Sequence, residues 1–386
     1  MHKNRIALFL TIIALTVALA VLGTAGCQPA PKQTVINVYN WGEYISNADD
    51  TITWMGQDYP VKDVIAEFET AYPQYKVNYQ NFDDNEKMYA KLDSEVYDVI
   101  VPSDYMVVRL IKEDRLLKLD KSKLTNVSQY LDNRLSALQL DADSAISAKV
   151  ADYAVPYMFC TVGLIYNQEE LGKIDATDPA EVWSVLFDPA MKNRIGMYSS
   201  MRETIGVALN YKGYSLNTLD NAQLNEVKQL LIDQSKNVQP LYGIDELKDK
   251  FVSGELLAGV VWSGDHVVCQ QRLEEDGQDP EILQYILPEG SNMSVDMMCI
   301  PKNAANPEGA LAFINFMYQP DIALMNAVYV GYSSPHTDVQ SRLPAAITGN
   351  SSYYPDAATI KTLEVYYSSE EIDSTYDKLW QVIMAN

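Results

Sequence analysis

The chain has few of the residues on which most enzyme and metal chemistry depends. Its 386 residues include three His and four Cys, and no two Cys have the C-x-x-C spacing of a zinc site. The patterns G-x-S-x-G, H-E-x-x-H, G-x-x-x-x-G-K-[ST] and G-x-G-x-x-G are also absent. These absences argue against a zinc protease of the H-E-x-x-H type, a serine hydrolase of the nucleophile-elbow type, a P-loop NTPase and a dinucleotide-binding enzyme. We therefore expect no enzyme activity, no metal and no cofactor.

Positive charge is also scarce. There are 29 Lys and Arg against 52 Asp and Glu, which gives a formal net charge of −23. Nucleic-acid binding needs a basic surface, so this composition excludes nucleic acid as an expected partner. A cation is a more natural ligand, although many acidic proteins bind none. The hydrophobic content of 47% is that of a globular protein, and the length suits about two or three domains.

The N-terminal segment has the features of an export signal. Lys3 and Arg5 precede an apolar run over residues 6–21, whose 16 residues are fewer than a membrane-spanning helix requires. A retained anchor is the weaker alternative. Small residues then lead directly to Cys27, which resembles the lipobox of bacterial lipoproteins, with Thr24 where that pattern usually has Leu. The resemblance implies cleavage before Cys27 and a diacylglycerol on its sulfur.

This signal predicts where the mature protein is located. Residues 1–26 would be removed, and the polar, Pro-containing residues 27–34 would form a tether between the lipid and the fold. Removal of 1–26 takes away two cations and no acids, so the charge becomes −25. We expect a lipid-anchored protein on the outer face of the cytoplasmic membrane or in the periplasm.

The three cysteines that follow Cys27 are widely spaced and odd in number. They are Cys160, Cys269 and Cys299. An oxidising compartment would allow one disulfide among them. Their apolar neighbours equally favour buried free thiols.

Strand and helix patterns alternate from residue 35 onward. The expected elements are a strand at 35–41, a helix at 61–72, a strand at 76–82, a helix at 85–92 and a strand at 97–101. The first helix is predicted from an apolar stripe at i, i+3, i+4 and i+7 that ends at Tyr72-Pro73. Such alternation predicts an α/β fold with a largely parallel sheet, in which ligands bind beyond the carboxyl ends of the strands.

A second α/β set is expected to follow. Residues 151–159 are strand-like but contain Pro156, which fits an edge or crossover strand. Further elements are predicted at 161–166, 195–198, 222–234, 245–251, 256–262, 282–287 and 294–300. A last helix is expected to begin at the Asn306-Pro307 cap and to end at Tyr318. Two lobes joined by crossover strands would place the strand-end loops of both in one cleft, where a small ligand binds.

Three strand ends combine an aromatic residue with a carboxylate. They are Trp41-Gly42-Glu43-Tyr44, Ser103-Asp104-Tyr105 and Trp262-Ser263-Gly264-Asp265. An alkylammonium group requires this chemistry, because a carboxylate satisfies its charge and its donors while a ring face attracts it or lies along its methylenes. For any one of these segments taken alone, packing of the aromatic side chain in the core is the favoured alternative.

A series of motifs in the same order along the chain resembles bacterial spermidine/putrescine-binding proteins, the extracytoplasmic receptors of polyamine ABC transporters. The likeness runs from about Val35 to the C-terminus. Motifs that carry it include Val38-Tyr39-Asn40-Trp41-Gly42-Glu43-Tyr44, Tyr97-Asp98-Val99-Ile100-Val101-Pro102-Ser103, Trp262-Ser263-Gly264-Asp265, Gly331-Tyr332 and Tyr354-Pro355-Asp356. The resemblance implies a two-lobed, type II periplasmic-binding-protein-like fold that closes by hinge motion. We expect residues 35–152 plus 296–330 in the first lobe and residues 153–295 plus 331–386 in the second.

The same resemblance implies a set of ligand-binding residues, with Asp296 as the central anchor. The set is Trp41, Glu43, Tyr44, Ser103, Tyr105, Glu203, Trp262, Asp265, Asp296 and Tyr332. The chain departs from spermidine receptors in having Ser200 in place of an acid, Ser294 in place of an aromatic residue and Tyr366 in place of Gln. These departures weaken the case for the longest polyamine. In contrast, an Asp at position 265 after Trp262-Ser263-Gly264 resembles the pattern in the putrescine-preferring relatives.

The hypothesis is therefore a receptor that binds putrescine, spermidine or both and delivers the polyamine to ABC permease subunits. One alternative is an iron(III) receptor, because Tyr353-Tyr354 and Tyr366-Tyr367 are adjacent phenols of the sort that bind a hard cation. The other is an exported hydrolase that uses two carboxylates.

Overall fold

The computed structural model describes residues 33–386 other than 133–134, 136–137 and 176. The expected signal at 1–26, the lipidation position Cys27 and the tether before residue 33 lie outside the described residues. Within the described part of the chain, no helix combines the length and the apolar character that crossing a membrane requires. Cys160, Cys269 and Cys299 are free and buried, as the second of the two alternatives predicted.

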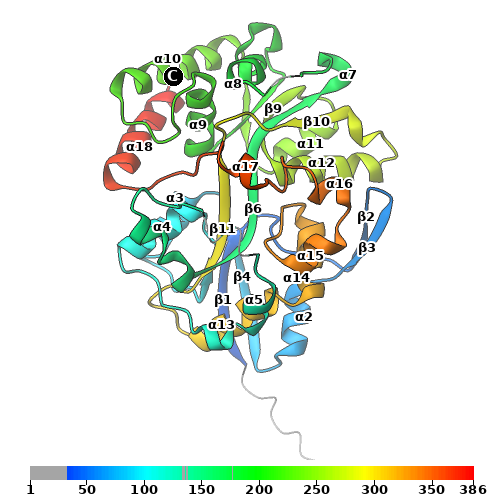
Figure 1. Ribbon diagram of the computed structural model, residues 1–386, viewed down its shortest axis with the longest axis vertical. Coiled ribbons are helices and arrows are strands. Elements are labelled where there is room, and N and C mark those ends of the chain that lie inside the picture. The colour runs from blue at the N-terminus through cyan, green and yellow to red at the C-terminus, as the bar shows by residue number, and fades with distance from the viewer. Residues whose placement is uncertain (1–32, 133–134, 136–137, 176) are drawn as a thin grey trace, which may run out of the picture.

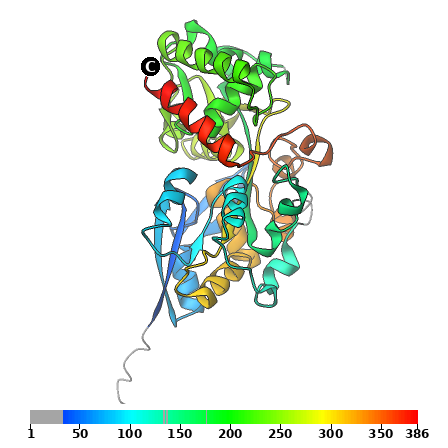
Figure 2. The same ribbon diagram turned by 90° about the vertical axis from the view of Figure 1, so that its left-hand side faces the viewer.

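The molecule consists of two α/β lobes that share one sheet (Figures 1 and 2). The strand order is β4-β1-β5-β11-β6-β9-β7-β8, and β10 pairs with β6. The bounds are β1 Thr34–Trp41, β4 Tyr75–Phe82, β5 Val99–Ile100, β6 Ala154–Asn167, β7 Ile195–Tyr198, β8 Leu241–Gly243, β9 Ala258–Trp262, β10 Leu283–Ile286 and β11 Met293–Cys299. The predicted α/β class and two-lobed architecture are confirmed.

Each lobe has its own parallel strands. In the first lobe β1 pairs in parallel with β4 and β5, and in the second β7 pairs in parallel with β8 and β9. The two sets are joined by β6 and β11, which pair antiparallel to each other and run from one lobe into the other (Figure 1).

The prediction of separate strands at 151–159 and 161–166 was wrong, because β6 is one strand of 14 residues. Pro156 does not end it. Proline cannot donate to a ladder, and Pro156 pairs with Met297 just where the register of β11 shifts between Asp296 and Met297. The irregularity therefore accommodates the proline within a long crossover strand.

Helices cover both faces of the sheet (Figure 2). Those around the first lobe include α2 Val64–Ala71, α3 Asn85–Lys91, α4 Asp104–Lys112, α5 Thr125–Tyr130, α13 Pro307–Met317, α14 Pro320–Val330 and α15 Thr337–Arg342. Those around the second lobe include α8 Pro179–Val182, α9 Met201–Tyr211, α10 Asn221–Asn237, α11 Glu246–Val252, α12 Ser263–Glu275 and α18 Glu370–Met384. The cap predicted for α13 is present, since the Asn306 side chain accepts from Gly309 N–H at 3.0 Å.

The segment after residue 331 is divided between the lobes. Leu131 of the first lobe pairs with His336, and α15 packs against α14. The chain returns to the second lobe later, where α18 packs against α9 and α10. The second-lobe segment expected at 331–386 thus begins with residues that remain beside the first lobe.

A hairpin that the sequence did not predict reaches from the first lobe to the second. It consists of β2 Asp50–Trp54 and β3 Gln57–Val61, and its turn residues Met55 and Gly56 have φ of 52° and 71°. The backbone N–H groups of both donate to the Glu274 carboxylate on α12 at 3.0 Å each. The lobes are therefore in contact on this side.

Four strand-to-helix turns meet where the lobes face each other. β5 leads to α4, β7 to α9, β8 to α11 and β9 to α12. Side chains at the starts of these helices consequently come together although they are far apart in the sequence. This is the position in which open α/β sheets bind ligands.

Candidate functional site

A cleft of about 450 Å³ lies between the two lobes. Every residue of the predicted ligand-binding set lines it: Trp41, Glu43, Tyr44, Ser103, Tyr105, Glu203, Trp262, Asp265, Asp296 and Tyr332. The structure thus brings the ten residues together. Their contact with a ligand remains a prediction.

The lining of the cleft is strongly acidic. Nine carboxylate side chains and two basic ones contribute to it: Glu43, Asp50, Asp83, Asp84, Glu203, Asp245, Asp265, Glu275 and Asp296, with Lys248 and Arg272. Low-dielectric walls focus the field of such a charge distribution, so the cleft attracts cations.

Asp296 lies on β11, lines the cleft and is buried. One carboxylate oxygen accepts from the Tyr44 hydroxyl and the other from the Ser103 hydroxyl, both at 2.7 Å. Ser103 is in turn held by Asn85, whose side-chain amide donates to its hydroxyl at 3.0 Å. Burial raises the pKa of Asp296 to about 6, although the two hydrogen bonds favour the ionised form.

Glu203 is the second buried carboxylate and lies in the first turn of α9. The Ser200 hydroxyl, at the N-cap of the same helix, donates to it. Burial raises the pKa of Glu203, while Ser200 and the neighbouring Arg202 favour its ionised form. Ser200 therefore supports Glu203 as a hydrogen-bond donor.

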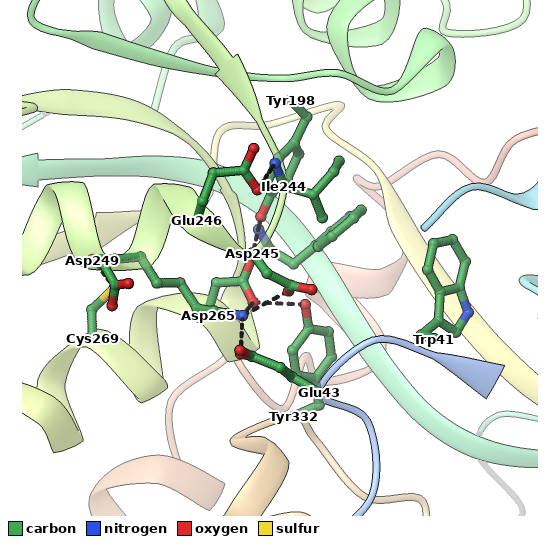
Figure 3. Close-up of polar contacts among 12 residues, drawn as sticks. Trp41, Glu43, Tyr198, Ile244, Asp245, Glu246, Asp249, Asp265, Cys269 and Tyr332 are labelled. Atoms are coloured by element: carbon green, nitrogen blue, oxygen red, sulfur yellow. Dashed lines mark hydrogen bonds and ion pairs between the residues drawn. The ribbon is translucent and has the colours of Figure 1, made fainter. Parts of the chain in front are cut away.

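Asp265 is the third buried carboxylate and lies in the first turn of α12. It accepts from the phenols of Tyr198 and of Tyr332, the latter at 3.0 Å, and the Lys248 ammonium lies 3.6 Å away. Burial raises the pKa of Asp265, and the charge of Lys248 opposes this shift. Figure 3 shows Tyr198 and Tyr332 on either side of this carboxylate.

Aromatic rings from both lobes face one another across the cleft. The rings of Trp41 and Trp262 are 6.3 Å apart in an edge-on arrangement, and Trp262 stacks on Tyr198 at 4.2 Å. Tyr44 and Tyr332 meet edge to face at 5.1 Å. These rings form apolar walls between the carboxylates.

Gly264 allows Tyr332 to take its place in this wall. A Cβ at position 264 would lie 1.9 Å from the Tyr332 ring, so any larger residue would displace it. The glycine of the Trp262-Ser263-Gly264-Asp265 segment is thus required by a close approach between α12 and Tyr332, the second residue after α14.

Sequence reasoning missed several residues that support the site. Asn85 and Tyr198 hold Ser103 and Asp265, and Asp245 and Lys248 of the β8–α11 region line the cleft. Asp245 was overlooked although Tyr242-Gly243-Ile244-Asp245 has the same aromatic-x-x-Asp spacing as Trp262-Ser263-Gly264-Asp265, and Lys248 follows it one helical turn later. A search for charged residues at every helix start that follows a strand would have found them.

The phenols considered for iron(III) lie elsewhere. Tyr353 is buried and its hydroxyl is 2.7 Å from His266 Nδ1, and the Tyr354 hydroxyl accepts from Ser334 N–H at 3.0 Å. Neither tyrosine lines the cleft. No group of three or more His, Cys, Asp or Glu side chains that could hold a metal occurs among the described residues.

Comparison with known proteins agrees with this architecture. Residues 63–354 match the family model of the bacterial extracellular solute-binding proteins. The spermidine/putrescine-binding periplasmic protein of Salmonella typhimurium is 31% identical over 370 residues, which cover 94% of this chain and 95% of the relative.

Two solved structures are similar over most of their length. One, described as a candidate spermidine/putrescine ABC transporter from Listeria monocytogenes, has a TM-score of 0.75 and 35% identity, covering 91% of this chain and 98% of that one. The other, the Tp0655 (TpPotD) lipoprotein of Treponema pallidum, has a TM-score of 0.67 and 25% identity, covering 91% and 99%.

The environment of Asp296 predicts a titration that can be measured without any ligand. In carboxyl ¹³C spectra of the protein labelled at Asp, we expect one resonance to titrate near pH 6 and to disappear in Asp296→Asn. Ser103→Ala removes a hydrogen bond that favours the carboxylate, so it should raise the pKa of Asp296 further. A titration of Asp296 near pH 4, the ordinary value for Asp, would contradict the prediction.

Proposed function

The chain belongs to the family of bacterial extracellular solute-binding proteins, and we propose that it is a polyamine receptor that binds putrescine or spermidine and delivers it to an ABC permease. This is a family of solute-binding transport receptors and not a family of enzymes. The relative from Salmonella is named for binding spermidine and putrescine, which supports the ligand class.

The observation that carries the proposal is a pair of buried carboxylates that form no ion pair within the described chain. Asp296 and Glu203 receive hydrogen bonds from hydroxyls, and no ion pair joins either of them to a Lys or Arg of the described residues. A buried ion is costly unless a partner compensates it. A ligand with an ammonium for each of them would supply both the charge and the donors that their oxygens lack.

The aromatic walls support an aliphatic amine rather than a metal ion. Trp41 and Trp262 present rings along which methylene groups can lie, and ring faces also attract an ammonium. A chain of methylenes with an ammonium at each end combines the two requirements. Putrescine is the shortest ligand of this kind that the relatives' names suggest.

The lobes provide the mechanism of delivery. Tyr44 and Ser103 belong to the first lobe, whereas Glu203 and Trp262 belong to the second. A ligand contacts both sets only when the lobes are closed, so binding shifts the population toward the closed form. The permease would recognise that form.

The protein is proposed to be attached to the membrane by a lipid on Cys27. The described chain enters the fold at Thr34, the start of β1, which lies at the end of the first lobe far from the cleft (Figures 1 and 2). A tether at this point would leave the cleft free to face the permease. The Treponema relative is named a lipoprotein, which supports the same arrangement. Two acyl chains suffice for stable anchoring.

Isothermal titration calorimetry tests the proposed ligand class. We expect the protein expressed from residue 28 to bind putrescine or spermidine at a single site with saturation, and not to bind glucose or a neutral amino acid. The absence of a saturable curve with every amine would refute the proposal.

Asp296→Asn tests the proposed anchor. The substitution keeps the shape of the side chain but leaves a ligand ammonium without its counter-charge, so affinity for the amine should fall at least about 30-fold. The control is Asp276→Asn, since Asp276 is an exposed residue at the end of α12. Equal affinities for the two variants would remove Asp296 from the site.

Metabolic labelling with an alkyne fatty acid tests the anchor. In a bacterium that processes lipoproteins, we expect the full chain to acquire the label, Cys27→Ser to lose it, and Cys160→Ser to keep it because Cys160 is buried in the fold. Labelling of Cys27→Ser would place the lipid elsewhere, and an unlabelled wild-type chain would exclude the anchor.

A further inference from the structure

Lys248 places an ammonium group inside the cleft. Its side chain extends from α11 of the second lobe and is only 5% exposed. The Nζ atom lies 2.8 Å from Asp245 Oδ1, 3.0 Å from Glu43 Oε2 and 3.6 Å from Asp265 Oδ1. Figure 3 shows these three carboxylates converging on one nitrogen atom. We call Glu43, Asp245 and Asp265 the acidic corner.

The lysine remains charged at this position. Burial disfavours the ammonium, but the carboxylates of the acidic corner outweigh it and raise the pKa of Lys248 above its ordinary value. The other cation nearby is Arg272, which is 3.5 Å from Glu43 but is held at 2.6 Å by Asp249, a residue outside the lining of the cleft. Lys248 is thus the principal counter-ion of the acidic corner.

A primary ammonium on a methylene chain is also the end group of a polyamine. Asp265 was predicted to be one of the ligand-binding residues, yet it already has two phenol donors and the Lys248 charge beside it. The ammonium of the protein therefore stands where a ligand ammonium would otherwise be required. Asp296 and Glu203 also line the cleft and are buried, but neither forms an ion pair with a Lys or Arg among the described residues.

We propose that Lys248 is a specificity-determining residue that closes the acidic corner to the ligand and so limits the cleft to amines with two ammonium groups. This inference rests on the proposed function and refines it. A diamine can direct its charges to Asp296 and Glu203. The additional ammonium of spermidine would have to approach Lys248, and two like charges at close range repel each other in a partly dry cleft.

Lys248 also joins the lobes, because Glu43 follows β1 of the first lobe and α11 belongs to the second. A variant could therefore weaken closure in general. Such an effect would weaken putrescine and spermidine binding alike. Loss of the repulsion between Lys248 and the additional ammonium of spermidine would instead change the ratio of the two affinities. The ratio of the two dissociation constants is therefore the quantity to measure.

The test compares the ratio of the putrescine and spermidine dissociation constants in two variants of the whole protein, Lys248→Met and Lys250→Met. Lys250 lies on the same helix, forms an ion pair with Glu255 at 2.6 Å and does not line the cleft. We expect Lys248→Met to shift the ratio of affinities toward spermidine by about tenfold or more, because the acidic corner then accepts a ligand ammonium. Lys250→Met should keep the wild-type ratio.

The possible results separate the two proposals. If the wild type binds putrescine and Lys248→Met keeps the wild-type ratio within about twofold, the inference fails and the receptor function stands. If neither the wild type nor the variant binds any amine, the proposed function fails and the inference falls with it. Should Lys248→Met not fold, the double variant Lys248→Met with Asp245→Asn removes a cation and an anion together and provides the same comparison.

Discussion

Carboxylates that are taken out of water between two lobes are the constraint on which this structure depends. Glu203, Asp265 and Asp296 are all buried, and two buried cations lie near them: Lys248 beside Asp265, and Arg202 next to Glu203 in the sequence. The fold meets part of the cost with hydroxyl donors, which are neutral and so do not cancel charge. The remaining negative charge favours a cation in the cleft and makes closure of the lobes without one costly.

The sheet topology explains how carboxylates from distant parts of the sequence reach one place. Glu203 and Asp265 occupy the first turns of α9 and α12, each directly after a strand that ends at the cleft. The positive end of a helix dipole favours a carboxylate at that position. The same turn geometry thus positions the acids and helps to keep them ionised, so the architecture and the electrostatics of the site have one origin.

Local patterns in the sequence predicted much of the fold but not its long-range pairing. Alternating residues identified β1, and the Asn306-Pro307 cap identified α13, because both signals act within a few residues. The continuity of β6 was missed because tolerance of Pro156 depends on the irregularity of a partner strand far along the chain. The β2–β3 hairpin was missed because Met55 gives no sign of the left-handed backbone that its turn adopts. Of the site, Glu43 and Asp265 were predicted from neighbouring aromatic residues, and Glu203 and Asp296 from the family resemblance. Lys248 was not predicted, since its role depends on carboxylates that the fold brings to it from three separate segments.

The register shift beside Asp296 has a mechanical consequence. The two strands that connect the lobes, β6 and β11, lose their regular pairing between Asp296 and Met297, and a paired ribbon bends most easily where its ladder is interrupted. If the lobes swing about that point, Asp296 lies at the pivot and travels the least of all the residues in the cleft. An amine could then dock on a carboxylate that is nearly stationary, while Glu203 and Trp262 are carried toward it on the longer lever arm of the second lobe.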